Sequence, residues 1–149
     1  MSQNFIYLVG LGSSIDPKID HLRTALQEMR QIFKLICVSD FIFTDPVGGV
    51  AMNTFVNSVA LIESEGTAVT VLDQLLTIET KMGRKRLKKW ADRSIDLDLL
   101  FGWLNFLPIN STDPYCIVPH PFFSEREFNQ SLTREILNSA RLLGINLNI

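Results

Sequence analysis

Apolar and polar residues alternate over residues 95–99 of the sequence. Because successive side chains of a β-strand point to opposite faces, the alternation predicts a strand whose aliphatic side chains lie on one face. Asp96 and Asp98 then lie together on the other face. Other apolar runs are typical of strands and lie at residues 5–9, 35–43, 55–62 and 116–118.

Apolar residues recur at helical spacing in three further segments, residues 16–33, 67–82 and 124–143. The apolar stripe of the last helix is predicted to comprise Phe128, Leu132, Ile136, Ala140 and Leu143. The order of elements is strand, helix, two strands, helix and strand, followed by a short strand and the last helix. This order is typical of the ferredoxin-like fold. We therefore predict an α+β protein with a βαββαβ antiparallel sheet, helices on one face and an added C-terminal helix.

Composition and length fit one soluble domain covering residues 1–149, with 46% hydrophobic and 20% charged residues. The chain has no signal-peptide pattern and no apolar run of membrane-spanning length, so we expect a cytoplasmic protein. Its two cysteines have neither metal-binding nor redox spacing. Seven of the 14 Lys and Arg residues lie between positions 81 and 93. Such a local patch on a chain of net charge −2 favours a small anionic ligand over a long nucleic acid.

The two aspartates and the basic segment together indicate a site for a nucleotide phosphate. Two carboxylates on one strand face repel each other, and Mg²⁺ between them would relieve the repulsion. The alternative is a solvent-facing edge strand. The six cations at positions 81–89 exceed what a helix C-terminus requires, although a solvated helix end is the simpler interpretation. A metal and guanidinium groups would neutralise the charge that develops in phosphoryl transfer. No P-loop motif is present.

Several other side chains have two interpretations. Phe55 and Phe128 are typical of core aromatics, but Phe55 shares a strand face with Asn57, and such a pair can bind a flat heterocycle. Trp90 lies beside the basic segment and can stack in the same way. His120, between two prolines, is either a rigid turn residue or a phosphate or ribose contact.

Taken in order, these residues fall into motifs that resemble those of the 6-hydroxymethyl-7,8-dihydropterin pyrophosphokinase family. The resemblance covers most of the chain, and its most specific part runs from Trp90 to Asp98, Trp-x-x-Arg-x-Ile-Asp-Leu-Asp. The other matching pieces are Gly12-Ser13, Thr44-x-Pro46-x-Gly48, Phe55-Val56-Asn57, Glu79, Gly83-Arg84-x-Arg86, Pro119-His120-Pro121 and Arg126-x-Phe128.

The resemblance implies an ATP-dependent diphosphotransferase of folate biosynthesis. It would transfer pyrophosphate from MgATP to the hydroxymethyl group of the pterin and release AMP. The resemblance implies that Asp96 and Asp98 hold two Mg²⁺ ions, and that Arg84 and Arg93 assist the transfer. The ATP-binding residues it implies are Glu79, Arg84, Arg86, Trp90, His120 and Arg126. The pterin-binding residues it implies are Thr44, Val47, Phe55, Asn57, Trp90 and Phe128.

The chain departs from the family pattern at two places. Ala91-Asp92 stands where the family usually has Gly-Pro, and Asn129-Gln130-Ser131 with a predicted helix replaces the usual segment after Phe128. A divergent paralogue that binds nucleotide or pterin with little turnover is therefore one alternative. Another is a non-enzymatic ferredoxin-like module that binds nucleic acid, but it lacks the expected strand aromatics and gives the aspartates no role. We expect a monomer that acts on ATP and the pterin, without nucleic acid or membrane partners.

Overall fold

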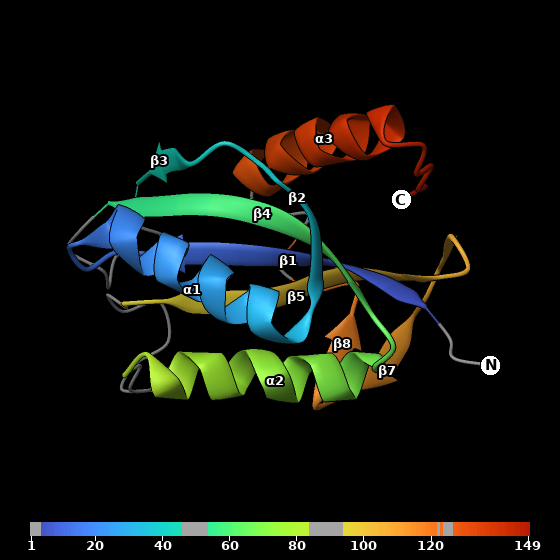
Figure 1. Cartoon of the computed structure of the whole chain (residues 1–149), viewed down its shortest axis with the longest axis horizontal. Helices are drawn as coiled ribbons and strands as arrows, with labels where there is room; N and C mark the ends of the chain where they lie inside the picture. The colour runs from blue at the N-terminus through green and yellow to red at the C-terminus, as the bar shows by residue number, and fades with distance from the viewer. Residues whose placement is uncertain (1–3, 46–53, 84–93, 122, 124–126) are drawn as a thin grey trace.

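The computed structural model describes residues 4–45, 54–83, 94–121, 123 and 127–149, the first two residues of the last range by their backbone alone. Six strands form one antiparallel sheet in the order β2–β4–β1–β5–β6, and β3 pairs with β4 (Figure 1). The sheet strands are β1 (Phe5–Ser13), β2 (Lys34–Val38), β3 (Ile42–Thr44), β4 (Phe55–Ser64), β5 (Asp96–Leu104) and β6 (Leu107–Pro108). A separate hairpin comprises β7 (Ser111–Asp113) and β8 (Cys116–Val118).

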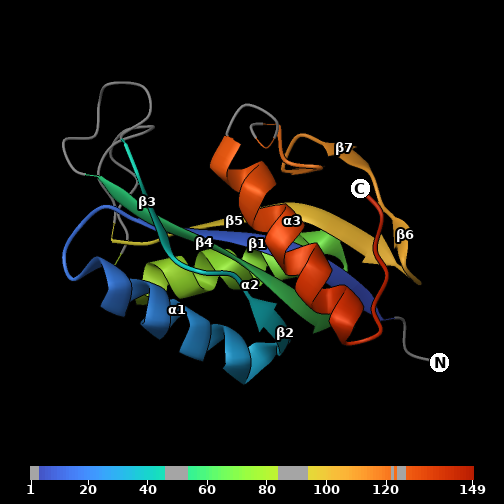
Figure 2. The ribbon, with the colours of Figure 1, turned by 90° about the horizontal axis from the view of Figure 1, so that it is seen from above.

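Three helices cover the sheet: α1 (Lys18–Ile32), α2 (Ala68–Lys81) and α3 (Glu127–Leu142). Helices α1 and α2 lie on one face and α3 lies on the other (Figures 1 and 2). The element order and the antiparallel central sheet confirm the predicted ferredoxin-like α+β fold with an added C-terminal helix. Within the described residues, no helix has both the length and the apolar character needed to cross a membrane.

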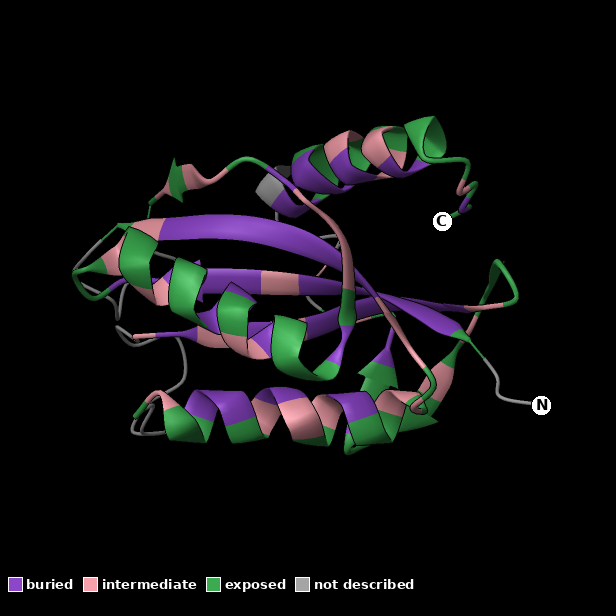
Figure 3. Ribbon diagram, viewed as in Figure 1, coloured by how far each residue is buried: buried purple, intermediate pink, exposed green. Residues whose placement is uncertain are grey.

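The middle strands are buried because helices pack on both of their faces (Figure 3). Toward α1 and α2, the apolar residues of the strands pack against Leu22, Ala25, Leu26, Met29, Val71, Leu75 and Ile78. Toward α3, a second cluster joins strand residues to Leu132, Ile136, Ala140 and Leu147. The predicted stripe of the last helix is therefore confirmed at three positions. It is wrong at Leu143, which lies just after the end of the helix at Leu142 and is 61% exposed.

A bulge changes the alternation of β5 halfway along the strand. Leu99 pairs with Val9, but Phe101 pairs with Leu8, so Leu100 is the extra residue. Before the bulge, Ile95, Leu97 and Leu99 pack toward α1 and α2. After it, Phe101 and Trp103 pack toward α3. The predicted separation of aliphatic and acidic side chains therefore holds for the first half of β5.

Two predicted strands have different bounds in the structure. The first strand does not end at Val9 but continues to Ser13, because it pairs with β4 on one side and β5 on the other throughout its length. The predicted strand at residues 35–43 is divided into β2 and β3 at Ser39. The Ser39 N–H still donates to the Val59 carbonyl at 2.9 Å, but the Val59 N–H donates to the Ser39 hydroxyl at 2.9 Å instead of to the Ser39 carbonyl, so regular strand pairing ends there.

The two ends of the described chain meet at the end of the sheet where β5 turns into β6. Phe5 pairs with Leu104, and the Trp103 indole Nε1 donates a hydrogen bond to the Asn148 carbonyl at 2.7 Å. Figure 1 shows both termini on this side of the molecule. The opposite end of the sheet carries Ser13, the start of β4 and the start of β5.

Cys37 and Cys116 are free thiols, and burial raises the pKa of both. The nearby carboxylates of Asp113 and Asp73 raise the Cys116 pKa further. The folded protein therefore keeps both thiols protonated at a pH at which the unfolded chain loses these protons. Their contribution to stability is complete below the unfolded thiol pKa of about 8.5 and is lost as the pH rises through the higher folded-state pKa.

We therefore expect the free energy of unfolding to fall between pH 8 and pH 10 more steeply for the wild type than for a Cys37→Ala/Cys116→Ala variant. Urea unfolding at several pH values, followed by circular dichroism, measures both slopes. Equal slopes would show that the thiols do not contribute to the pH dependence.

Candidate active site

Three residues are in register across the neighbouring strands β4, β1 and β5, near the end of β1 at Ser13. Gly12 of β1 pairs with Asn57 of β4 on one side and with Asp96 of β5 on the other. Directly paired residues of an antiparallel sheet point to the same face, so Asn57 and Asp96 flank a position that has no side chain. Their strands are separated by two interstrand spacings, about 10 Å.

The next row of this face repeats the arrangement. Gly10 pairs with Val59 and with Asp98, so a second glycine lies beside the second aspartate. The row after that contains Leu8, which packs in the cluster under α3. The face that α3 covers at one end therefore continues, at the other end, as a floor of two glycines between β4 and β5. Leu100 covers Gly10, because a Cβ on Gly10 would lie 3.2 Å from Leu100 Cδ1.

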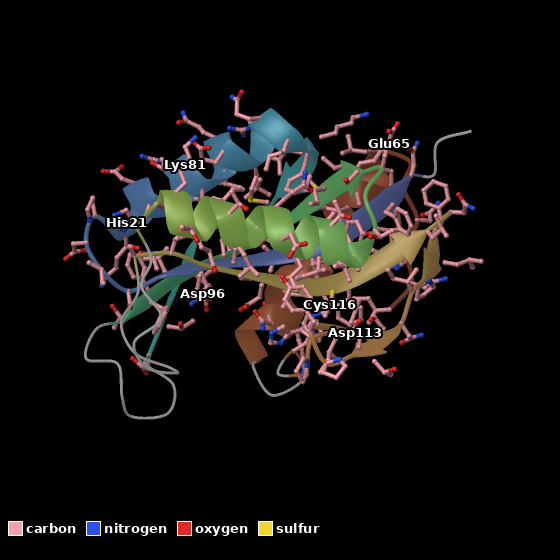
Figure 4. The ribbon with its side chains drawn as sticks, turned by 90° about the horizontal axis from the view of Figure 1, so that it is seen from below. His21, Glu65, Lys81, Asp96, Asp113 and Cys116 are labelled. Atoms are coloured by element: carbon pink, nitrogen blue, oxygen red, sulfur yellow. The ribbon has the colours of Figure 1, made fainter. Side chains whose placement is uncertain are left out.

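Asp96 and Asp98 share this face because the residues that alternate with them are in the core on the opposite side. Both aspartates are partly exposed, and their Cα atoms are about 7 Å apart along the strand. Figure 4 shows Asp96 near one end of the sheet, away from Glu65 at the other end. The pair fits Mg²⁺, which is commonly held by one or two carboxylates together with substrate phosphates and water. The prediction that both acids lie on one open face is confirmed.

His120 lies beside the second aspartate. Its Nε2 is 3.8 Å from Oδ1 of Asp98, which is an ion pair when the imidazole is protonated. Its backbone N–H donates to the Leu100 carbonyl at 2.9 Å, which attaches the Pro119–Pro121 turn to the edge of β5. The structure thus brings His120 to the aspartates, and a contact between His120 and ATP remains a prediction.

Three of the residues predicted to bind the pterin converge on the other side of the glycine floor. Asn57 Nδ2 donates to Thr44 Oγ1 at 2.6 Å, and Thr44 pairs with Phe55 across β3 and β4. A Cβ atom placed on Gly12 would lie 3.0 Å from Asn57 Oδ1 and 3.7 Å from Phe55 Cδ1. The amide oxygen and the aromatic ring therefore both border the space above Gly12. Phe55 and Asn57 therefore lie on one face of β4, as the sequence predicts.

Glu79 lies on the opposite side of the sheet, on α2. It is 2% exposed, and its Oε2 accepts the backbone N–H of Leu97 at 2.7 Å. Leu97 is the residue between the two aspartates. The prediction that Glu79 binds ATP remains untested, whereas the structure shows a contact with β5 that the sequence did not indicate.

The other predicted site residues lie outside the described part of the chain. They are Val47, Arg84, Arg86, Trp90, Arg93 and Arg126, together with the side chain of Phe128. The backbone after Phe128 belongs to α3, which confirms the predicted helix at this departure from the family pattern.

The glycine floor is the feature of the site that the sequence interpretation missed. In the sequence, Gly12 contributes only to the Gly12-Ser13 motif, and Gly10 has no assigned role. Their spacing of two residues was the available signal, because it continues the alternation of the first strand and places both glycines on one face.

The fold and this face together define an α+β protein with paired acids on one strand and an aromatic ring beside an amide two strands away. Comparison with known sequences identifies the family. The family described as 7,8-dihydro-6-hydroxymethylpterin-pyrophosphokinase (HPPK) matches residues 8–138, and the chain belongs to this family. It is therefore an ATP-dependent diphosphotransferase.

Individual relatives agree with this assignment, and each is named 2-amino-4-hydroxy-6-hydroxymethyldihydropteridine pyrophosphokinase. A protein of Haemophilus influenzae is 35% identical over 123 residues, covering 80% of this chain and 74% of that protein. A protein of Campylobacter jejuni is 34% identical over 128 residues, covering 84% and 78%. A protein of Bacillus subtilis is 33% identical over 127 residues, covering 84% and 74%.

Proposed function

We propose that this enzyme transfers pyrophosphate from ATP to the hydroxymethyl group of 6-hydroxymethyl-7,8-dihydropterin, in folate biosynthesis, at the face described above. The register of Asn57, Gly12 and Asp96 carries the proposal. It sets the proposed ring-binding groups and the carboxylates on one face, with a buried glycine between them. The acceptor hydroxyl and the ATP phosphates would then meet above Gly12.

On the nucleotide side, Asp96 and Asp98 would hold two Mg²⁺ ions through their carboxylates. When bound, the metal neutralises negative charge that develops on the phosphates during transfer. Arg84 and Arg93 would assist by binding phosphate oxygens. Glu79, Arg86, Trp90, His120 and Arg126 complete the ATP-binding residues of the proposal.

On the acceptor side, Phe55 and Phe128 would stack on the two faces of the pterin, with Trp90 closing over the site. Asn57 would contact the ring edge through its amide, whose orientation is fixed by the hydrogen bond to Thr44. Backbone groups around Thr44 and Val47 would contact the remaining edge. A fixed amide suits this role because no reorientation is needed when the substrate binds.

The reaction exchanges one phosphorus–oxygen bond for another. The hydroxymethyl oxygen of the pterin bonds to the β-phosphorus of ATP and loses its proton. The bond from the β-phosphorus to the oxygen that bridges to the α-phosphorus breaks, and AMP leaves. The aspartates and the ring-binding residues contribute by holding the two reacting atoms close together.

Measuring AMP release from MgATP, with and without 6-hydroxymethyl-7,8-dihydropterin, tests this function. We expect AMP only when the pterin is present, in equal amounts with the pterin pyrophosphate ester. Pterin binding without AMP formation would instead support a paralogue with little turnover. AMP formation that does not depend on the pterin would contradict the proposed acceptor.

A further inference from the structure

We propose that Glu79 is a positioning residue for the metal-binding aspartates, and that it acts by holding the backbone between them from the opposite side of the sheet. The inference rests on the proposed role of Asp96 and Asp98. This task on the backbone of β5 is separate from the ATP contact proposed for Glu79 above.

Within the part of the chain that the structure describes, the first half of β5 lies against another strand along one of its two edges. Its residues from Asp96 onward pair with β1, whereas β6 pairs only with Trp103 and Leu104. Farther along, the Leu100 carbonyl accepts the N–H of His120. At the start of the strand, the Leu97 N–H donates to the Glu79 carboxylate. The Glu79 carboxylate therefore accepts the N–H that a carbonyl of a neighbouring strand would otherwise accept.

The burial of Glu79 makes this hydrogen bond strong. Glu79 is 2% exposed and follows Ile78, which belongs to the apolar stripe of α2. An acid that is almost completely buried is costly unless hydrogen bonds compensate for its lost hydration. A hydrogen bond from a backbone N–H to a carboxylate is one of the stronger kinds in proteins, and the 2.7 Å distance is short.

The position of Leu97 links this bond to the aspartates. Its side chain is 3% exposed and packs in the core toward α1 and α2. With its N–H held by Glu79 and its side chain enclosed by the core, Leu97 fixes the peptide planes on both of its sides. Asp96 and Asp98 are attached to those planes and point to the other face. Contacts on the side of the sheet that α1 and α2 cover therefore determine the distance between the two carboxylates on the opposite face.

Glu79→Ala is expected to raise the Mg²⁺ concentration for half-maximal AMP release by about 10-fold or more, the range typical of residues that orient metal ligands. The KM for the pterin should change by less than about twofold, since the hydrogen bond between Asn57 and Thr44 is untouched. Glu79→Gln retains an oxygen that can accept the Leu97 N–H, so it should recover most of the loss.

A second measurement needs neither substrate nor metal. Amide hydrogen exchange at Leu97, measured by NMR on the free protein, should be at least about 10-fold faster in Glu79→Ala than in the wild type, because the N–H loses its acceptor. Glu28→Ala is the matched control. Its Oε2 accepts from Lys81 Nζ at 2.8 Å near the same end of α2, and this pair joins α1 to α2 rather than α2 to β5, so Leu97 exchange and Mg²⁺ dependence should stay unchanged.

The outcomes separate this inference from the proposed function. Unchanged Mg²⁺ dependence in a folded Glu79→Ala protein would overturn the positioning role, as would unchanged Leu97 exchange. If Glu79→Ala does not fold, Glu79→Leu, which also lacks an acceptor oxygen and suits the buried position, takes its place: faster Leu97 exchange with a raised Mg²⁺ requirement supports the role, and unchanged values overturn it. If the wild type releases no AMP, the proposed function fails, but Leu97 exchange and Mg²⁺-dependent binding of ATP still test Glu79.

Discussion

Asp96→Ala and Asp98→Ala are each expected to lower kcat for AMP release by about 10³-fold or more. A bound metal contributes several kcal/mol of charge stabilisation in the transition state, and each 1.36 kcal/mol corresponds to a factor of about ten in rate. Each substitution removes one of the two carboxylates that would hold it. Both aspartates are partly exposed and point away from the core, so folding should be little affected. Steady-state kinetics with saturating pterin and varied Mg²⁺ measure the effect.

Asp20→Ala provides the matched control for removing an acid. Asp20 lies on the exposed surface of α1, 4.0 Å from Arg23, and such surface pairs contribute little. Its kcat should stay within about twofold of the wild type. An Asp96→Ala or Asp98→Ala enzyme that keeps more than a tenth of the wild-type kcat would contradict the proposed role of that carboxylate.

Gly12→Ala is expected to lower kcat/KM for the pterin by about 10²-fold. The new methyl group would lie 3.0 Å from Asn57 Oδ1, in the space between the ring-binding groups and Asp96. Because Asn57 also bonds to Thr44, it cannot move aside without breaking that hydrogen bond. A displacement of about 1 Å between reacting groups is enough for a loss of this size. Initial rates at varied pterin concentration and saturating MgATP measure it.

Gly66→Ala is a control with similar local crowding. Its Cβ would lie 3.2 Å from Thr70 Cγ2, but Gly66 is in the turn between β4 and α2 at the far end of the sheet. We expect its kcat/KM to match that of the wild type after correction for folded fraction. If the kcat/KM of Gly12→Ala for the pterin equals that of Gly66→Ala, the pterin does not lie over Gly12 when it reacts.

The placement of Asp96 and Asp98 was predictable because it follows from local geometry. A period of two assigns alternate residues to opposite faces, and Ile95 and Leu97 indicate which face is buried. The same reasoning correctly put Phe55 and Asn57 on one face. The order of strands and helices was enough to predict the ferredoxin-like sheet.

Features that depend on distant contacts were not predictable in this way. Glycine is unfavourable in strands, so local preference opposed the continuation of β1 through Gly10 and Gly12, and their two-residue spacing was the one local signal in its favour. The pairing with β4 and β5 overrides that preference. Similarly, Ser39 interrupts an apolar run because its hydroxyl bonds to β4, and Glu79 finds its partner only when α2 packs against β5. These contacts join residues that are far apart in the sequence.

The meeting of the two ends of the chain near Leu104 has a practical consequence. Phe5 is seven residues from Gly12 and five from Gly10 on β1, which separates the terminal end of the sheet from Asp96 by about 23 Å and from Asp98 by about 17 Å. A fluorescent label, an affinity tag or a fused domain attached at either end therefore starts well away from the glycine floor. Immobilisation through either terminus should leave that face directed toward the solution, available to ATP and the pterin.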